Sequence, residues 1–155
     1  MKFKIASAVV AMFFLLQAQA QDSTKSTIKT MIDAKHYVFE PVSTITGGGR
    51  SRHLTPGYFL EINGDTAKIY LPYYGKAYSA PMNPSDVGYD FTSTKMEYAV
   101  KEGKKNTYVI SVKVKDKINN PEFNLTVYDD GTAYLRAMSA DRQSTSYNGS
   151  VRMKE

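Results

Sequence analysis

The second half of the chain alternates between apolar and polar side chains. Across residues 107–115 every second side chain is apolar, at Tyr108, Ile110, Val112 and Val114. Successive side chains of a β-strand point to opposite faces, so this pattern predicts a strand with one buried and one hydrated face. The same alternation predicts further strands over residues 95–100, 123–128, 132–138 and 143–151.

Turn signals separate the apolar runs. Residues 58–62 and 66–71 are two β-rich runs that flank Asn-Gly-Asp at residues 63–65. Asn-Gly between such runs favours a tight hairpin, because the turn needs positive φ. Asp-Asp-Gly at residues 129–131 predicts a second tight turn.

A first strand is expected from His36 onward, with Pro41 at a bulge or on an edge because proline cannot donate a ladder hydrogen bond. Several short strands joined by tight turns predict an all-β fold that is mainly antiparallel. Either a sandwich or an open barrel satisfies the pattern.

One short helix is predicted before the strands, over residues 22–34. Ile28, Met31 and Ile32 would lie on one helical face, and Asp22 or Ser23 would cap the first turn. The alternative is a flexible linker with a frayed turn.

The first twenty residues have the features of a secretory signal peptide. Lys2 and Lys4 precede an apolar run over residues 5–16, and Ala-Gln-Ala follows at 18–20. An uncleaved membrane anchor is the alternative, but the run is short for a bilayer-spanning helix. We therefore expect a signal peptide over residues 1–20, a single β-rich domain over 21–155, and no transmembrane segment after cleavage.

The amino-acid composition limits the cellular location and the kinds of partner that the protein is expected to have. The 155 residues include no cysteine, which excludes disulfides and thiolate metal sites. An exported chain without cysteine suits a bacterial periplasm or the cell exterior better than an animal secretory pathway. Loss of Lys2 and Lys4 leaves 18 of the 20 basic residues against 15 acidic ones, too weak a bias to indicate nucleic-acid binding. Lysines at 113, 115 and 117 on a hydrated strand face discourage edge-to-edge association, so we expect a monomer.

Two segments are not explained by the strand pattern. The Tyr/Pro segment, residues 70–81, holds four tyrosines and two prolines. Its rings could form a platform for a ligand or partner, or a crossover that plugs one end of the β-core. Packing is the more common role of aromatic residues, which favours the crossover.

The Arg-Gln-Ser segment, residues 141–149, contains an arginine that could bind a carboxylate with two hydrogen bonds. Alternatively, Arg142 pairs internally with a carboxylate such as Asp90 or Glu97 and fixes the strand register. On a regular strand Arg142 would lie on the face opposite to Tyr147.

Together the two segments supply the candidate ligand or partner surface. Its expected occupant is an unknown small ligand or, alternatively, another envelope protein. The candidate residues are Tyr73, Tyr74, Lys76, Tyr78, Arg142, Gln143, Ser144 and Tyr147.

No chemical motif rises above background. The two histidines, His36 and His53, do not form a metal-binding motif with nearby acidic residues. No serine lies in a nucleophile-elbow motif. We predict no catalytic residues, no metal site and no cofactor, and therefore a binding protein more readily than an enzyme.

Residues 71–81 and 142–149 resemble the two signatures of a secreted bacterial family, domain of unknown function 4251. The order of parts is also similar: signal peptide, short helix, strands, the Leu-Pro-Tyr segment, a late hairpin, and the Arg-Gln-Ser segment near the end. The resemblance implies an exported β-domain and brings no established activity. In the family the first signature often continues into a glycine-rich stretch, which residues 82–88 of this chain do not provide.

Overall fold

The computed structural model describes residues 27–46, 48–78 and 88–154. The predicted signal peptide, the predicted helix cap and residues 79–81 of the Tyr/Pro segment lie outside these residues. The described part of the predicted helix is helical over residues 27–33. No helix among the described residues is long and apolar enough to cross a membrane.

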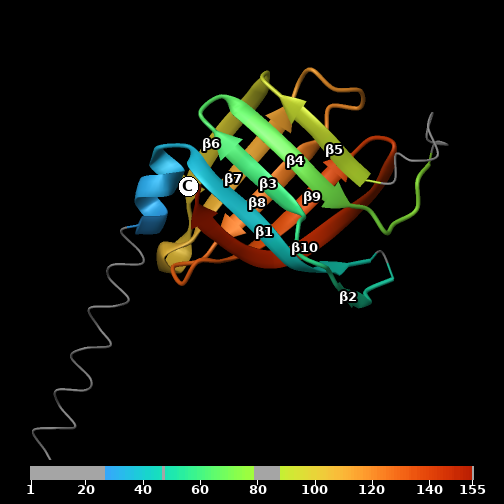
Figure 1. The fold of residues 1–155 in the computed structure, drawn as a ribbon, viewed down its shortest axis with the longest axis horizontal. Helices are drawn as coiled ribbons and strands as arrows, with labels where there is room; N and C mark the ends of the chain where they lie inside the picture. Colours follow the sequence, from blue (N-terminus) through green and yellow to red (C-terminus); the bar gives the residue numbers. More distant parts are fainter. Residues whose placement is uncertain (1–26, 47, 79–87, 155) are drawn as a thin grey trace, which may run out of the picture.

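Ten strands follow the helix, with a short 3-10 helix, η1 (Lys104–Asn106), between β6 and β7 (Figure 1). The strands, in chain order, are β1 (His36–Ile45), β2 (Ser51–His53), β3 (Phe59–Asn63), β4 (Thr66–Pro72), β5 (Gly88–Ser93), β6 (Met96–Glu102), β7 (Tyr108–Val114), β8 (Glu122–Val127), β9 (Thr132–Ser139) and β10 (Arg142–Met153).

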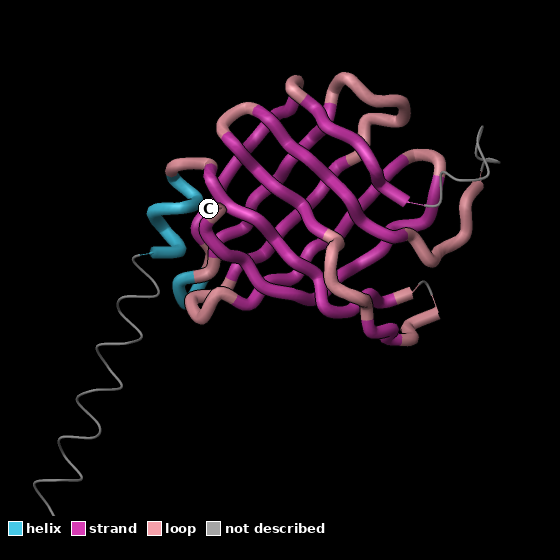
Figure 2. Tube along the Cα trace, in the orientation of Figure 1, coloured by secondary structure: helices cyan, strands magenta, loops and turns pink. Residues whose placement is uncertain are grey.

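All strand pairs are antiparallel, in the order β5-β4-β3-β1-β10-β9-β8-β7-β6, and β2 pairs with β1 beside this path. β5 and β6 are the two edge strands at opposite sides of the sheet, yet only two residues join them in the chain. The sheet therefore curls into a half-barrel, with two crossing layers of strands (Figure 2). The predicted antiparallel all-β fold is confirmed, and its shape is the open one.

Aromatic contacts across the interior join the two layers. The rings of Tyr89 on β5 and Phe123 on β8 meet edge to face, with centroids 5.2 Å apart. Near the opposite end, the hydroxyls of Tyr37 and Tyr98 lie 3.2 Å apart and share a hydrogen bond. The interior is thus filled by side chains, as in a packed core.

The burial pattern confirms the predicted periodicity. Alternate residues of β7 are buried, from Tyr108 to Val114. Ile28, Met31 and Ile32 of the helix are each at most 3% exposed and belong to the same core. The apolar helical face therefore covers one end of the half-barrel.

β1 lies between β3 and β10, but its pairing with β3 ends at Phe39 and its pairing with β2 starts at Ser43, so Pro41 is paired on the β10 side alone. The pairing with β10 shifts by one residue between Pro41 and Ser43, which is the predicted bulge. β2 and β5 were not predicted. Both are short, and neither stands in a long alternating run, so their pairing depends on neighbouring strands.

Candidate functional site

The fold brings the Tyr/Pro segment and the Arg-Gln-Ser segment together. Ala77 and Arg142 form an antiparallel bridge. The Tyr78 amide donates a hydrogen bond to the Asp141 carbonyl at 2.7 Å, and the Gln143 amide donates to the Lys76 carbonyl at 3.0 Å. The chain leaving β4 therefore runs beside the start of β10 and is held there by an isolated β-bridge.

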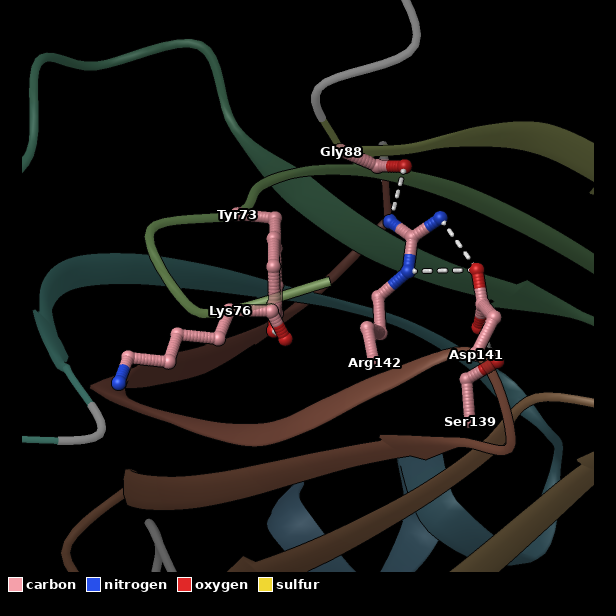
Figure 3. Close-up of polar contacts among 6 residues, drawn as sticks. All are labelled: Tyr73, Lys76, Gly88, Ser139, Asp141 and Arg142. Carbon is pink, nitrogen blue, oxygen red and sulfur yellow. Dashed lines mark hydrogen bonds and ion pairs between the residues drawn. The ribbon is translucent and has the colours of Figure 1, made fainter. Parts of the chain in front are cut away.

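Arg142 contacts the Tyr/Pro segment, β5 and Asp141 at this end of the molecule (Figure 3). Its Nε and Nη2 donate to Oδ2 of Asp141 at 3.1 and 2.9 Å, and Nη1 donates to the Gly88 carbonyl at 3.1 Å. The guanidinium lies over two rings, 5.2 Å from the centroid of Tyr73 and 5.1 Å from that of Tyr89. With 14% of its side chain exposed, Arg142 is committed to internal contacts.

The predicted partners of Arg142 were wrong, although the prediction of an internal pair was right. The carboxylate is that of the adjacent Asp141, while Glu97 pairs with Lys115 at 3.1 Å. Asp141 also accepts a short hydrogen bond from the Ser139 hydroxyl.

The predicted facing of Arg142 was wrong as well. The pairing of β10 with β9 shifts by one residue between Arg142 and Thr145. Such a bulge reverses the alternation of side chains beyond it. Arg142 consequently points inward, on the same side as the buried Thr145 and Tyr147, whereas Ser144 lies outside and accepts a hydrogen bond from Arg136 at 3.3 Å.

Tyr73 folds back onto its own segment. Its hydroxyl donates to the Lys76 carbonyl at 2.7 Å, and the residue is 7% exposed. A Cβ atom at Gly75 would collide with the Tyr73 hydroxyl. The glycine is required here because the ring passes over its Cα.

Gly88 is also required to be a glycine by a close contact. A Cβ at this position would collide with the Leu71 carbonyl on β4. Glycine lets β5 begin close to β4, and its own carbonyl then accepts the Arg142 hydrogen bond.

Tyr73, Tyr89 and Tyr147 interact electrostatically with one another and with Arg142. Tyr147 is fully buried and donates to the Pro72 carbonyl at 2.7 Å, and burial raises its pKa. Burial also raises the pKa of Tyr89 to about 12, against the opposing effect of Arg142. The Tyr89 hydroxyl is buried without a hydrogen-bond partner in the described part of the chain. Such a group is costly unless something satisfies it.

The Asp141 carboxyl lies in the same cluster. Burial alone would raise its pKa, but hydrogen bonds from Arg142 and Ser139 outweigh that effect and lower it. The carboxylate is therefore ionised together with its guanidinium partner at neutral pH.

Other candidate residues face solvent. Tyr78 is 71% exposed, Tyr74 is 38% exposed, and Lys76 is exposed beside them. In Figure 3 the Lys76 amine extends away from the arginine. The candidate set thus separates into largely buried members (Tyr73, Arg142, Tyr147), exposed members (Tyr74, Lys76, Tyr78) and the half-buried Gln143 and Ser144.

An aromatic surface continues from Tyr74 along the outside of the half-barrel. The guanidinium of Arg52 on β2 lies 4.7 Å from the Tyr74 ring centroid. The rings of Tyr58 and Tyr70 are 5.3 Å apart, and interaction with Tyr74 contributes to the raised pKa of Tyr58, after burial. Tyr58 is half-buried and also packs against the core. We call the exposed residues Arg52, Tyr70 and Tyr74 the outer tyrosine surface.

Sequence reasoning missed Asp141, Gly75, Gly88, Tyr89 and Arg52. Gly75 lies inside the Tyr/Pro segment and Gly88 follows it in the sequence. The need for glycine at each position becomes evident only in the folded structure, where a Cβ atom would collide with a neighbouring group. No group of three or more histidine, aspartate or glutamate residues that could hold a metal occurs among the described residues.

Comparison with known proteins gives a family and a fold. The family model for the domain of unknown function DUF4251 matches residues 19–151. A crystal structure of a DUF4251 family protein from Bacteroides eggerthii DSM 20697 is similar, with a TM-score of 0.63 and 12% sequence identity over 84% of this chain and 88% of that one. No curated protein matches the sequence. On the extent of the family match, the chain belongs to the DUF4251 family.

Proposed function

We propose that this is an exported, non-catalytic binding protein of the bacterial cell envelope, which recognises another envelope protein through the exposed part of the Tyr/Pro segment. The observation that carries the proposal is the separation of one segment into a buried anchor and an exposed face. Tyr73 is fixed beneath Arg142, whereas Tyr74 and Tyr78 present their rings to solvent.

The anchor gives the exposed rings a defined place. Main-chain hydrogen bonds of Lys76 and Tyr78 to the start of β10 hold the segment on both sides of Ala77. Binding costs less when the recognition residues are ordered beforehand. Tyrosine and arginine are also enriched among residues that dominate binding energy, which suits the outer tyrosine surface.

The envelope location is supported by sequence rather than by geometry. Residues 1–20 have the signal-peptide pattern, and the chain has no cysteine. The similar crystal structure comes from a bacterium of the genus Bacteroides.

Capture from envelope extracts tests the proposal quantitatively. Mature protein over residues 21–155 is compared with a Tyr74→Ser/Tyr78→Ser variant and with Tyr128→Ser, which alters a tyrosine 42% exposed in the β8–β9 turn. We expect one extract protein to be retained by the wild type and by Tyr128→Ser, and lost with the double variant. Equal retention by all three proteins, with unchanged circular dichroism, would count against recognition through this segment.

A small polar ligand is a second candidate, favoured by the Tyr89 hydroxyl. A ligand with a hydrogen-bond acceptor near Arg142 would satisfy this group. Mass spectrometry of protein purified under native conditions would test it. A bound molecule that is retained by the wild type and lost in Tyr89→Phe supports this candidate, and the same molecule in both proteins contradicts it.

A further inference from the structure

The hydrogen bonds at the two ends of the β6–β7 ladder reveal which groups of β6 remain open. The Lys115 amide donates to the Lys95 carbonyl, and the Gly103 amide donates to the Thr107 carbonyl, each at 2.8 Å. In an antiparallel pair, alternate residues bond to the neighbour, so positions 97, 99 and 101 bond to β7. The amides and carbonyls of residues 96, 98, 100 and 102 therefore point away from the sheet.

These edge groups have no backbone partner within the described residues, since β6 ends the strand order. The other edge strand, β5, is engaged by side chains at its two ends. The Gly88 carbonyl of β5 is capped by Arg142, and Asp116 accepts hydrogen bonds at the far end of β5 from the Ser93 hydroxyl at 2.5 Å and from the Thr94 amide at 3.4 Å. β6 is thus a seven-residue strand whose middle offers an uncapped edge, a template for strand pairing.

We propose that β6 pairs antiparallel with β6 of a second copy of this chain, about a two-fold axis at Ala99. This register makes Tyr98 a hydrogen-bonded pair with Val100 of the partner subunit, and Met96 a pair with Glu102 of the partner subunit. All four outward-pointing positions of each strand then find a backbone partner. The two half-barrels share one continuous sheet.

Charge selects this register. On the solvent face of β6, Glu97 lies opposite Lys101 of the partner subunit, and the two-fold axis repeats the pair. Opposite charges directly across a strand pair stabilise it, and like charges destabilise it. Ala99 at the axis is small enough for the strands to approach, and a register shifted by two residues would lose both charge pairs.

Burial favours the same arrangement. Val100 lies on the same face of β6 as Met96 and Tyr98, which pack on the core. It is nevertheless 42% exposed, because no strand covers it at the edge of the sheet. In the paired strand, Tyr98 of the partner subunit would cover it.

The expectation of a monomer depended on Lys113, Lys115 and Lys117, none of which belongs to the edge strand β6. Lys113 lies on β7 between β6 and β8, where it pairs with Glu122, and Lys115 follows β7 and pairs with Glu97. Because edge pairing buries little surface, we expect a weak dimer, with a dissociation constant roughly micromolar or weaker.

Sedimentation velocity of the mature chain over a range of concentrations tests the dimer. Three variants address the register: Glu97→Lys, Lys101→Glu, and both together. Each single variant places like charges opposite one another twice, and the double variant restores the pairs with reversed sign. Lys104→Glu is the control, because it makes the same charge change outside β6.

We expect concentration-dependent dimerisation of the wild type, a dissociation constant about tenfold or more higher in each single variant, and recovery in the double variant. Lys104→Glu should behave as the wild type, and circular dichroism should be the same for all. A wild type that stays monomeric at its highest soluble concentration would overturn the proposal. Dimerisation that survives both single variants, or that the double variant fails to recover, would also overturn it.

Discussion

Tyr73 and Tyr74 are adjacent and chemically identical, but the fold uses them differently. Tyr73 is 7% exposed, its hydroxyl bonds to the Lys76 carbonyl, and its ring lies beneath Arg142. Tyr74 is 38% exposed, and its ring lies beside Arg52 on the outside. The Tyr73 ring is therefore buried with its hydroxyl satisfied by a backbone acceptor, whereas Tyr74 keeps part of its ring in contact with solvent.

Arg142 and Arg52, which lie against Tyr73 and Tyr74, differ in the same way. Arg142 contacts two rings, a carboxylate and a main-chain carbonyl, whereas Arg52 lies on the exposed strand β2 over one ring. We infer that stability is concentrated in the inner cluster and that the outer tyrosine surface contributes little to folding. Four predictions, from the largest effect to the smallest, test this contrast.

Arg142→Ala should have the largest effect. It removes the guanidinium from the half-buried Asp141 carboxylate, which keeps its hydrogen bond from Ser139, and it removes the donor to the Gly88 carbonyl. We expect a loss of about 3 kcal/mol in the free energy of unfolding. Urea titration measures it. Arg52→Ala should cost less than about 0.5 kcal/mol, as for other exposed positions. Similar losses in the two variants would contradict the division into inner and outer sets.

Gly75→Ala should destabilise the protein by about 1–3 kcal/mol, because the new methyl group collides with the Tyr73 hydroxyl and forces the ring from its place. Gly48→Ala is a matched control, since a Cβ there meets nothing within 4 Å. Thermal unfolding of both variants would check this. A Gly75→Ala protein as stable as Gly48→Ala would mean that Tyr73 is not fixed.

The Asp141–Arg142 pair should make stability depend on pH. The pKa of Asp141 is lower in the folded protein than in the unfolded chain, so its contribution is present above the unfolded value of about 3.9 and is lost as the pH falls through the folded value.

Asp141→Asn isolates this contribution from the other carboxylates. We expect the variant to be less stable than the wild type by on the order of 1–3 kcal/mol at pH 7, and the difference to shrink in acid. Urea titrations of both proteins at a series of pH values would show it. A difference that does not change with pH would exclude the carboxylate charge as its cause.

Tyr89→Phe should have the smallest effect, within about 0.5 kcal/mol of the wild type, because its hydroxyl has no partner in the described part of the chain. Tyr147→Phe loses the bond to the Pro72 carbonyl and should cost about 1 kcal/mol. Differential scanning calorimetry of the apo protein distinguishes them. A loss in Tyr89→Phe as large as that in Tyr147→Phe would contradict a hydroxyl without a hydrogen-bond partner.

The fold was largely predictable from local pattern. The alternation in β7 and the Asn-Gly turn between β3 and β4 follow from the period of a strand and the φ of a turn, which are local properties. The burial of Ile28, Met31 and Ile32 follows from helical spacing in the same way. β5 escaped prediction because it is short and completed by its neighbour β4.

The site was predictable only as a list of residues. The sequence marked Tyr73, Tyr74, Tyr78 and Arg142 as unusual, but it placed Arg142 on the wrong face, because a one-residue bulge in β10 has no strong local signal. It likewise proposed a carboxylate such as Asp90 or Glu97 as the arginine's partner, whereas the structure pairs Arg142 with Asp141.

By itself, the sequence determined the strands, the turns and the buried helix face, since each depends on residues a few positions apart. The tertiary structure decided which tyrosines are buried, which carboxylate meets Arg142 and which strand edge stays open. Those outcomes depend on where the sheet curls and where β10 shifts register, and both are set by contacts between residues distant in the chain.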